Sequence, residues 1–263
     1  MTETYETLTV DARGAVTVVT LDRPPVNAVN RTMQLELAAA FESFADDRTV
    51  HAVVLTGSGR KAFCAGIDLT EVSSGSEDQR PVPLTLDAGH EWRRAQHAVH
   101  HCAVPVVAAV EGYVIGAGFG LAGVCDLIVA AEDARFALTE INVGLLGGAS
   151  KAIRMLGPYR ARRMLFGGEL ESAHELHRLG AVEEVVASGT AAERAVEIAQ
   201  VFASKSPLAL RLAKESILRI EGGQMEAQYR TEQDYTARMR ALHDSTEAMR
   251  AFAEKREPHW TWS

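Results

Sequence analysis

The residues best suited to chemistry lie in two short stretches of small side chains, each directly after an apolar run. IGAGFGLAGVCD, residues 115–126, holds four glycines and two alanines, and KAFCAGIDL, residues 61–69, also leads through small residues to an aspartate. A glycine-rich turn between a strand and a helix exposes backbone N–H groups at the positive end of the helix dipole. Two such turns can each aim one N–H at the same point, and a pair of this kind stabilises an oxyanion.

Glycines spaced as in residues 115–126 also occur in nucleotide-binding loops and in tightly packed helices. The stretch matches the dinucleotide pattern G-x-G-x-x-G only loosely, and no acidic residue is suitably placed on a second strand to bind a ribose, so a dinucleotide site is poorly supported. A Walker loop is excluded because no Gly-Lys-Ser/Thr follows. Tight packing between helix and strand remains the structural alternative to anion binding.

The elements around these stretches alternate between strand and helix. Residues 15–22 and 50–57 are rich in β-branched side chains and predict strands, and a helix over 31–45, capped by Asn30, separates them. A second unit follows, with a helix at 91–101 and strands at 104–110 and 126–131. This alternation predicts an α/β core with mostly parallel strands.

Beyond about residue 147 helical patterns dominate. Ser206 and Pro207 predict the start of a helix that runs to Ile220, because a capping hydroxyl stands just before a proline at the first helical position. The polar stretch 71–90 is the best candidate for a mobile loop.

Composition excludes several classes of protein. The chain has 263 residues with 27 Lys plus Arg and 35 Asp plus Glu, which gives a net charge of −8 and argues against a nucleic-acid partner. No apolar run is long enough to cross a bilayer and the first ten residues do not resemble a signal peptide, so we predict a cytoplasmic protein with no membrane partner. Cys64, Cys102 and Cys125 lack metal-ligand spacing and predict buried free thiols.

Four segments together resemble the crotonase, or enoyl-CoA hydratase/isomerase, superfamily: VNAVN (26–30), AFCAGIDL (62–69), EGYVIGAGFGLAGVCDLIVAAEDARFALTEINVG (111–144) and EAMRAFAEKREP (247–258). The resemblance implies an α/β fold of the crotonase type, a spiral of ββα repeats, with C-terminal helices that build a homotrimer, often paired into a hexamer. On this basis we predict a spiral core with an acyl-CoA pocket over residues 1–200 and a helical region for oligomerisation and pocket closure over 201–263. No metal and no cofactor beyond the CoA of the substrate are implied.

The same resemblance assigns an oxyanion hole. The backbone N–H groups of Ile67 and of Ala117, which lies between Gly116 and Gly118, are the expected donors to the thioester oxygen as it becomes enolate-like. Two preorganised donors of this kind are each worth ~3 kcal/mol of barrier.

One of the two acid/base positions of the family is vacant. Enoyl-CoA hydratases of this superfamily carry two glutamates, and the first position here is Gly120, whereas the second is Glu140 in Thr139-Glu140-Ile141. The apolar neighbours of Glu140 are expected to raise its pKa toward the range of a general base. One base is enough for a double-bond shift, and the resemblance implies that members lacking the first glutamate include isomerases and enzymes that open cyclic β-ketoacyl-CoA rings with water. Gly120 also leaves room for a bulky or cyclic acyl group. Isomerisation, or hydration or ring opening of such an acyl-CoA, is therefore favoured over simple hydration of crotonyl-CoA.

The remaining positions are carried over from the family by alignment of its motifs. CoA contacts are expected at Ala28, Ala65, Asp68 and Leu69, with Lys61 or Arg60 near a phosphate, Lys255 near a neighbouring subunit's CoA, and His90 or Glu91 at the acyl pocket, to which Tyr229 or Tyr235 can add a phenol. His97, His100 and His101 lack the spacing of a metal site. Two alternatives stay open: a catalytically silent member that binds acyl-CoA, and an RNA-binding role, against which the negative charge argues.

Overall fold

Two β-sheets form the centre of the molecule in the computed structural model, which describes residues 4–74, 89–221 and 224–261. Most of the loop predicted at 71–90 lies outside the described residues. The larger sheet has the strand order β1-β2-β3-β5-β7-β10, and all its strands run parallel except β1, which is antiparallel to β2. Its strands are β1 (Leu8–Arg13), β2 (Val16–Leu21), β3 (Ala52–Gly57), β5 (Val106–Val110), β7 (Leu127–Ala131) and β10 (Glu184–Val186).

The smaller sheet has the order β4-β6-β8-β9. It consists of β4 (Ala62–Cys64), β6 (Tyr113–Ile115), β8 (Arg135–Ala137) and β9 (Glu171–Ser172). The chain alternates between the sheets, because β3, β5 and β7 of the larger sheet lead directly into β4, β6 and β8 of the smaller one. Each pair of strands is followed by helical structure, which confirms the predicted spiral of ββα repeats.

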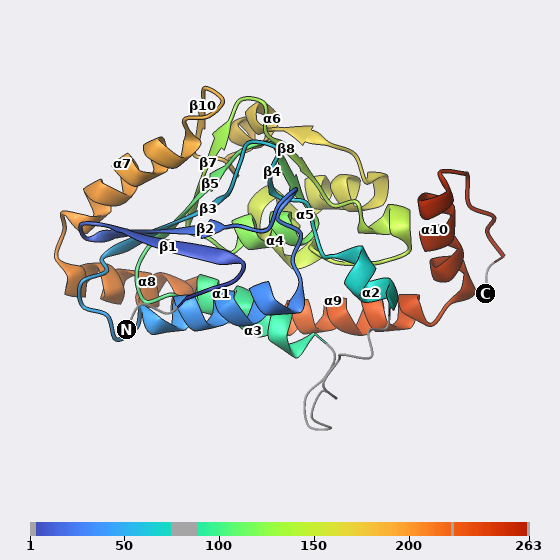
Figure 1. Cartoon of the computed structure of the whole chain (residues 1–263), viewed down its shortest axis with the longest axis horizontal. Helices are drawn as coiled ribbons and strands as arrows, with labels where there is room; N and C mark the ends of the chain where they lie inside the picture. Colours follow the sequence, from blue (N-terminus) through green and yellow to red (C-terminus); the bar gives the residue numbers. More distant parts are fainter. Residues whose placement is uncertain (1–3, 75–88, 222–223, 262–263) are drawn as a thin grey trace.

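Helices cover both faces of the larger sheet (Figure 1). They are α1 (Arg31–Ser43), α2 (Leu69–Ser74), α3 (His90–His100), α4 (Ala117–Gly123), the short 3-10 helix η1 (Glu140–Val143), α5 (Ala149–Gly167), α6 (Ala173–Arg178), α7 (Ala191–Ala203), α8 (Pro207–Glu221), α9 (Gln224–Arg240) and α10 (His243–Glu254). None of the helices described combines the length and the apolar character that a membrane span requires.

Side chains of the larger sheet alternate between two apolar cores, as the pleat of a strand requires. On β3, Ala52 and Val54 face a core completed by α7, whereas Val53 and Leu55 face the larger core that contains α1, α3 and α4. The three cysteines lie buried as free thiols, as predicted. The sheet is therefore buried on both faces and rigidly supports the loops at its edge.

The predicted elements of the core match the structure closely. Asn30 caps α1 by accepting a hydrogen bond from the N–H of Met33 at 3.0 Å, and Ser206 stands before α8. Strand β1 and the whole smaller sheet were not predicted. Strands of two or three residues, such as β4 and β9, are too short to show a hydrophobic period.

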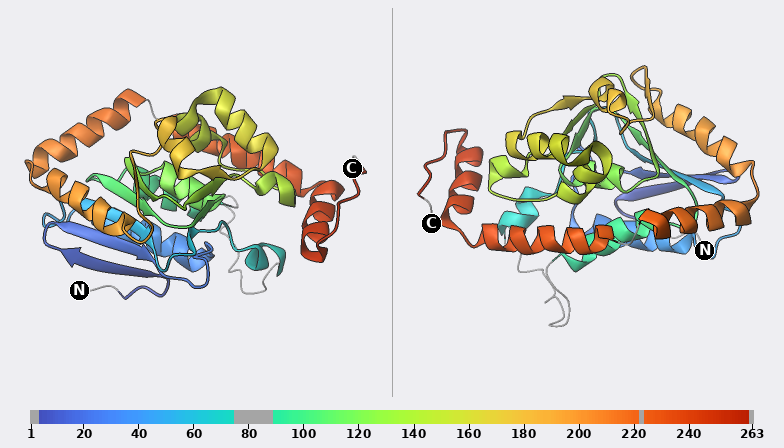
Figure 2. Two further views of the ribbon diagram at one scale, coloured as in Figure 1. Left: turned by 90° about the horizontal axis from the view of Figure 1, so that it is seen from above. Right: turned by 180° about the vertical axis from the view of Figure 1, so that it is seen from behind.

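Helix α9 lies against two helices of the core. It packs against α3 and α5, and the carboxylate of Glu232 accepts a 2.5 Å hydrogen bond from the N–H of Ser150 at the start of α5. Figure 2 shows α10 beyond α9 at the far end of the molecule from the strands β1 and β2. The predicted boundary near residue 200 coincides with the end of α7, and the division into two regions stays a prediction.

Candidate active site

The two glycine-rich loops predicted to form an oxyanion hole lie side by side. Parallel pairing of β4 with β6 brings the chain after Cys64 next to the chain after Ile115. The contact requires glycine, because a Cβ on Gly118 would stand 2.1 Å from the carbonyl oxygen of Cys64. Gly66 has a positive φ of 110° and lies against the carbonyl of Ile115, so both loops depend on residues without side chains.

The backbone N–H groups of Ile67 and Ala117 have the local geometry of free donors. A bridge between Val29 and Ile67 uses the N–H groups of Val29 and Asp68 and leaves that of Ile67 out of the pairing. Ala117 is the first residue of α4, and the first N–H groups of a helix have no acceptor within the helix. Both groups can therefore donate to a ligand oxygen placed between the loops.

Glu140 reaches toward the start of α4 from the first position of η1. Its Oε1 atom lies 3.1 Å from the site of a Cβ on Gly116 and 3.4 Å from that of a Cβ on Gly147, so two glycines make room for the carboxylate. The Oε2 atom is buried without a hydrogen-bond partner among the described residues. Burial raises the pKa of Glu140 to about 7, in the direction that the sequence predicted, and the charge of Glu232 adds to this shift.

Gly120 lies one helical turn beyond Gly116 on α4. A Cβ at this position would meet only ordinary contact, with the side-chain Oε1 of Gln96 at 3.7 Å. Gly120 lies within a regular helix and is not one of the glycines with positive φ. A Cβ thus fits at this position, and the side chain nearest to it is an amide from α3 and not a second carboxylate.

The positions assigned to CoA lie around the first loop. Asp68 is engaged by an ion pair with Arg23 at 2.6 Å, and its other oxygen accepts from the N–H of Thr70. Lys61 and Leu69 are exposed, whereas Ala28 and Ala65 are partly buried. Contacts of these residues with CoA stay predictions.

Residues at the start of α3 divide between two roles. Glu91 forms a two-point ion pair with Arg31 of α1, with distances of 2.7 and 2.8 Å, which fixes it as a link between helices. His90 begins α3, and the residues that follow it on this helix line a cavity. Tyr229 of α9 lines the same cavity, whereas Tyr235 is half exposed.

Two acidic residues of the second repeat serve the fold. Glu111 accepts hydrogen bonds from the N–H groups of Gly189 and Ala191, so it caps α7 and lies away from substrate chemistry. Asp126 accepts from the N–H of Val106 and pairs with Lys214 at 2.7 Å, which anchors the strand that it opens.

The polar residues of the cavity itself, above all Gln96, Ser150 and Lys151, were not predicted from the sequence. They come from α3 and α5, and burial of all three is nearly complete, at 4%, 4% and 1% exposure. The histidines of α3 also border the cavity, and burial lowers the pKa of His100 to about 3, so this ring is neutral. No three His, Cys, Asp or Glu side chains converge as metal ligands in the part of the chain that the structure describes.

A spiral of ββα repeats that holds two free N–H groups beside a buried carboxylate defines an enzyme of the crotonase class. The enoyl-CoA hydratase/isomerase family model matches residues 11–262, and the chain belongs to this family. Members of the family act on acyl-CoA thioesters, and so the substrate of this enzyme is an acyl-CoA.

Relatives in the family carry out different reactions. A Mycobacterium tuberculosis enzyme, (7aS)-7a-methyl-1,5-dioxo-2,3,5,6,7,7a-hexahydro-1H-indene-carboxyl-CoA hydrolase, is 36% identical over 91% of this chain and 95% of its own length. The 2,3-dehydroadipyl-CoA hydratase of Escherichia coli is 34% identical over 95% of this chain and 97% of its own. The crystal structure of carnitinyl-CoA hydratase from Mycobacterium avium is 33% identical, with a TM-score of 0.87 over 99% of this chain and all of that one.

Proposed function

We propose that this enzyme generates a thioester enolate in the oxyanion hole of Ile67 and Ala117, with Glu140 as the single general acid/base. The observation that carries the proposal is the pairing of one buried carboxylate, whose pKa is about 7, with a Gly120 that has the amide of Gln96, and no second carboxylate, beside it. A base of this pKa is half deprotonated near neutral pH and can both take and return a proton. Because the two N–H groups stabilise the enolate, the reaction requires no metal or added cofactor.

The reaction that this site supports best is ring opening of a cyclic β-ketoacyl-CoA by water. Glu140 takes a proton from water as the water oxygen attacks the ring ketone carbon. The bond between this carbon and the α-carbon then breaks, and its electron pair forms the enolate that Ile67 and Ala117 hold. Glu140 returns the proton to the α-carbon, so the ketone becomes a carboxylic acid and one water is consumed. The similarity to the mycobacterial hydrolase supports this choice.

Double-bond isomerisation is the second candidate, because it needs the same single base and no water. Glu140 would remove a proton from one carbon of an unsaturated acyl chain and return it to another. Hydration of crotonyl-CoA is disfavoured, since a water beside Gly120 has no carboxylate of its own. A catalytically silent acyl-CoA-binding protein would leave the buried Glu140 without a role.

Mass spectrometry of acyl-CoA thioesters after incubation with the enzyme separates these reactions. Ring opening and hydration both add the mass of one water, and isomerisation leaves the mass unchanged while the double bond moves. Ring opening is expected for cyclic β-keto thioesters, with little turnover of crotonyl-CoA. Failure to transform any cyclic or unsaturated thioester, while CoA thioesters still bind, would support the silent alternative.

We further propose that the chain assembles as a homotrimer or as a hexamer of two trimers. Large apolar side chains are exposed on α5 and α8, where a monomer gains nothing from them. The most exposed are Tyr159, Phe166, Leu208, Leu212 and Ile220, at 65–85%. Light scattering during size-exclusion chromatography tests this, with a monomeric mass as the contrary result.

A further inference from the structure

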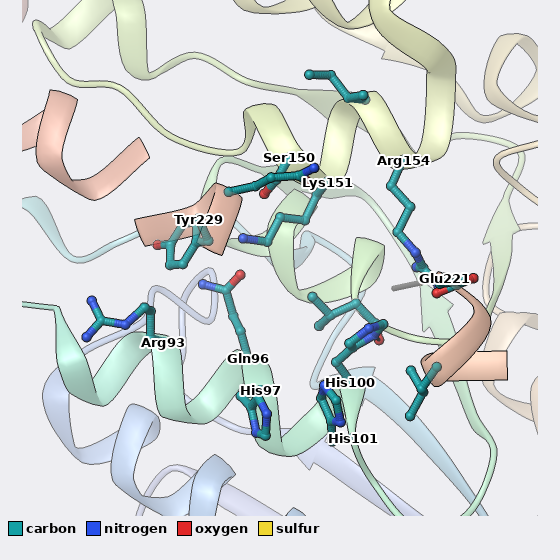
Figure 3. Close-up of a pocket in the computed structure, with 14 residues that line it drawn as sticks. Arg93, Gln96, His97, His100, His101, Ser150, Lys151, Arg154, Glu221 and Tyr229 are labelled. Carbon is teal, nitrogen blue, oxygen red and sulfur yellow. Dashed lines mark hydrogen bonds and ion pairs between the residues drawn. The ribbon is translucent and has the colours of Figure 1, made fainter. Parts of the chain in front are cut away.

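A cavity lies between α3, α5 and α9, and one of the side chains that line it, Gln96, also faces Gly120 of α4. Its volume is about 370 Å³, and Figure 3 shows Gln96, Lys151 and Tyr229 directed toward its centre from these three helices. The hydroxyl-bearing Ser150 lies above them on α5. This space is large enough for part of a small organic ligand.

One glycine face of α4 joins the catalytic carboxylate to this cavity. Gly116 faces Glu140, and Gly120, one helical turn further on, faces Gln96, which lines the cavity. Gly123 at the end of α4 is closed off, because a Cβ there would stand 2.8 Å from the Sδ of Met155 and 3.1 Å from the Cβ of Lys151. An acyl chain whose thioester is held at Ala117 would therefore reach the cavity past Gly120 and Gln96.

Lys151 is a buried cation without an anionic partner. Its side chain is 1% exposed, and its Nζ atom lies 3.3 Å from the centre of the Tyr229 ring. Among the described residues, none forms a hydrogen bond or an ion pair with this Nζ. Glu232 faces it from α9 beyond ion-pair distance and favours its charge, but burial outweighs this and lowers the pKa of Lys151 to about 7.

The other cations at the cavity are already occupied. Arg154 pairs with Glu221 at 3.2 Å and donates to the carbonyl of Gly123. Arg93 donates to the side chain of Gln233. Of the cavity's cationic side chains, Lys151 is therefore the one that offers its hydrogen-bond donors to a ligand.

Three polar atoms around Lys151 also lack partners within the described chain. The Oε1 atom of Gln96, the Oγ atom of Ser150 and the Oε2 atom of Glu232 are buried and make no hydrogen bond to a described residue, although the Gln96 side chain does hydrogen-bond that of Tyr229. The hydroxyl of Ser150 is a donor, and rotation of the Gln96 amide presents N–H in place of oxygen. Buried polar groups are normally paired, so this cluster indicates a polar ligand.

We propose that Lys151 binds a second oxygen function of the substrate, a carboxylate or a ring carbonyl at the end of the acyl group remote from the thioester. This inference rests on the proposed function, because it assumes that the thioester occupies the oxyanion hole. Gln96 and Ser150 add hydrogen bonds to the same oxygen function. Lys151 thereby selects acyl groups that carry such an oxygen and rejects purely apolar ones, which would leave the buried ammonium unpaired.

Binding of three saturated thioesters of equal chain length tests the proposal without turnover. Hexanoyl-CoA has an apolar end, 5-oxohexanoyl-CoA has a carbonyl, and adipyl-CoA has a carboxylate. Isothermal titration calorimetry at pH 7 is expected to show one or both oxygen-bearing thioesters binding at least about tenfold more tightly than hexanoyl-CoA, since hydrogen bonds to charged groups are the stronger class. Comparison of the affinities of 5-oxohexanoyl-CoA and adipyl-CoA shows whether the site prefers a carbonyl or a carboxylate.

The Lys151→Met variant is expected to lose this preference and to bind all three thioesters alike. Lys205→Met, which removes an exposed lysine of the α7–α8 turn, is the matched control and should keep it. Circular dichroism establishes that both variants fold, and Gln96→Leu gives a second, weaker disruption of the same cluster. Equal binding of the three thioesters by the wild type would overturn the role of Lys151 alone. Failure to bind any of them would instead overturn the proposed function.

Discussion

The Oε1 atom of Gln96 stands 3.7 Å from the position that a Cβ would take on Gly120, so an amide faces the vacancy where the hydratases of the superfamily carry a glutamate. The candidate base, Glu140, lies against Gly116, which is one helical turn before Gly120. Under the proposed function, a substrate would therefore exchange protons with one carboxylate, and its acyl group would pass Gln96.

Filling this vacancy is expected to change the reaction. Gly120→Glu should lower the native activity by occupying the acyl pocket, and should introduce weak hydration of crotonyl-CoA, because general acid/base help is worth ~10² to 10⁴-fold. The backbone of α4 accepts the new side chain, since Gly120 has no positive φ. Spectrophotometry of crotonyl-CoA gives the rates, and wild-type turnover as fast as that of a two-glutamate hydratase would contradict the assignment of a single base.

Two glycines of α4 are expected to respond differently to alanine. Gly118→Ala places a methyl group 2.1 Å from the backbone oxygen of Cys64 and should destabilise the fold by about 1–3 kcal/mol through overpacking. Gly120→Ala should be neutral or stabilising by up to about 1 kcal/mol, because alanine is the better helix former and its Cβ would make only ordinary contact, with Gln96. Urea denaturation measures the free energy of unfolding of both variants. Equal losses of stability would contradict the inference that Gly120 accommodates a Cβ and Gly118 does not.

The sequence alone predicted the architecture because the fold depends on local patterns. The strand at 50–57 and the helix capped by Asn30 have clear periods and end signals, and the two loops of small residues adjoin strands in each repeat. The raised pKa of Glu140 followed from its apolar neighbours. The short strands of the smaller sheet carry no comparable signal.

The cavity was not predictable in the same way. Gln96 and Lys151 are 55 positions apart along a chain in which each looks like an ordinary polar residue of a helix. Only the packing of α3, α5 and α9 buries them together, and a lysine that is 1% exposed cannot be recognised from sequence period. The ion pair of Glu91 was hidden from the sequence for the same reason, since its partner Arg31 lies on another helix.

Removing the basicity of Glu140 is expected to lower turnover strongly and leave binding nearly intact. Glu140→Gln keeps the shape of the side chain, so turnover should fall by ~10² to 10⁴-fold while CoA-thioester affinity changes only a few-fold. Steady-state kinetics and calorimetry measure the two effects. Wild-type activity in this variant would remove Glu140 from the mechanism.

The pH dependence of the wild type offers an independent check on Glu140. With a pKa of about 7, the carboxyl is protonated at lower pH, so kcat/KM should rise with pH through neutrality and then level off.

The folded protein retains this proton between pH 4.5 and 7 whereas the unfolded chain has released it, so the contribution of Glu140 to stability decreases as pH rises through this window. Glu140→Gln should remove that component. A pH profile with no change near neutrality would argue against the base.

Lys151 should show the opposite dependence of stability on pH. Its pKa falls from 10.5 to about 7 in the folded protein, so between these values the unfolded chain holds a proton that the folded protein has lost. The free energy of unfolding contributed by this group therefore rises with pH from about 7 to 10.5.

At pH 6 the buried ammonium is charged without an anionic partner, and Lys151→Met should stabilise the empty enzyme by ~2 kcal/mol. This gain should shrink as pH rises toward 10.5, above which the wild-type amine is neutral in both states. Urea denaturation at several pH values, with Lys205→Met as the control, measures the difference, and a Lys151→Met variant less stable than the wild type at pH 6 would show that the ammonium is satisfied in the empty protein.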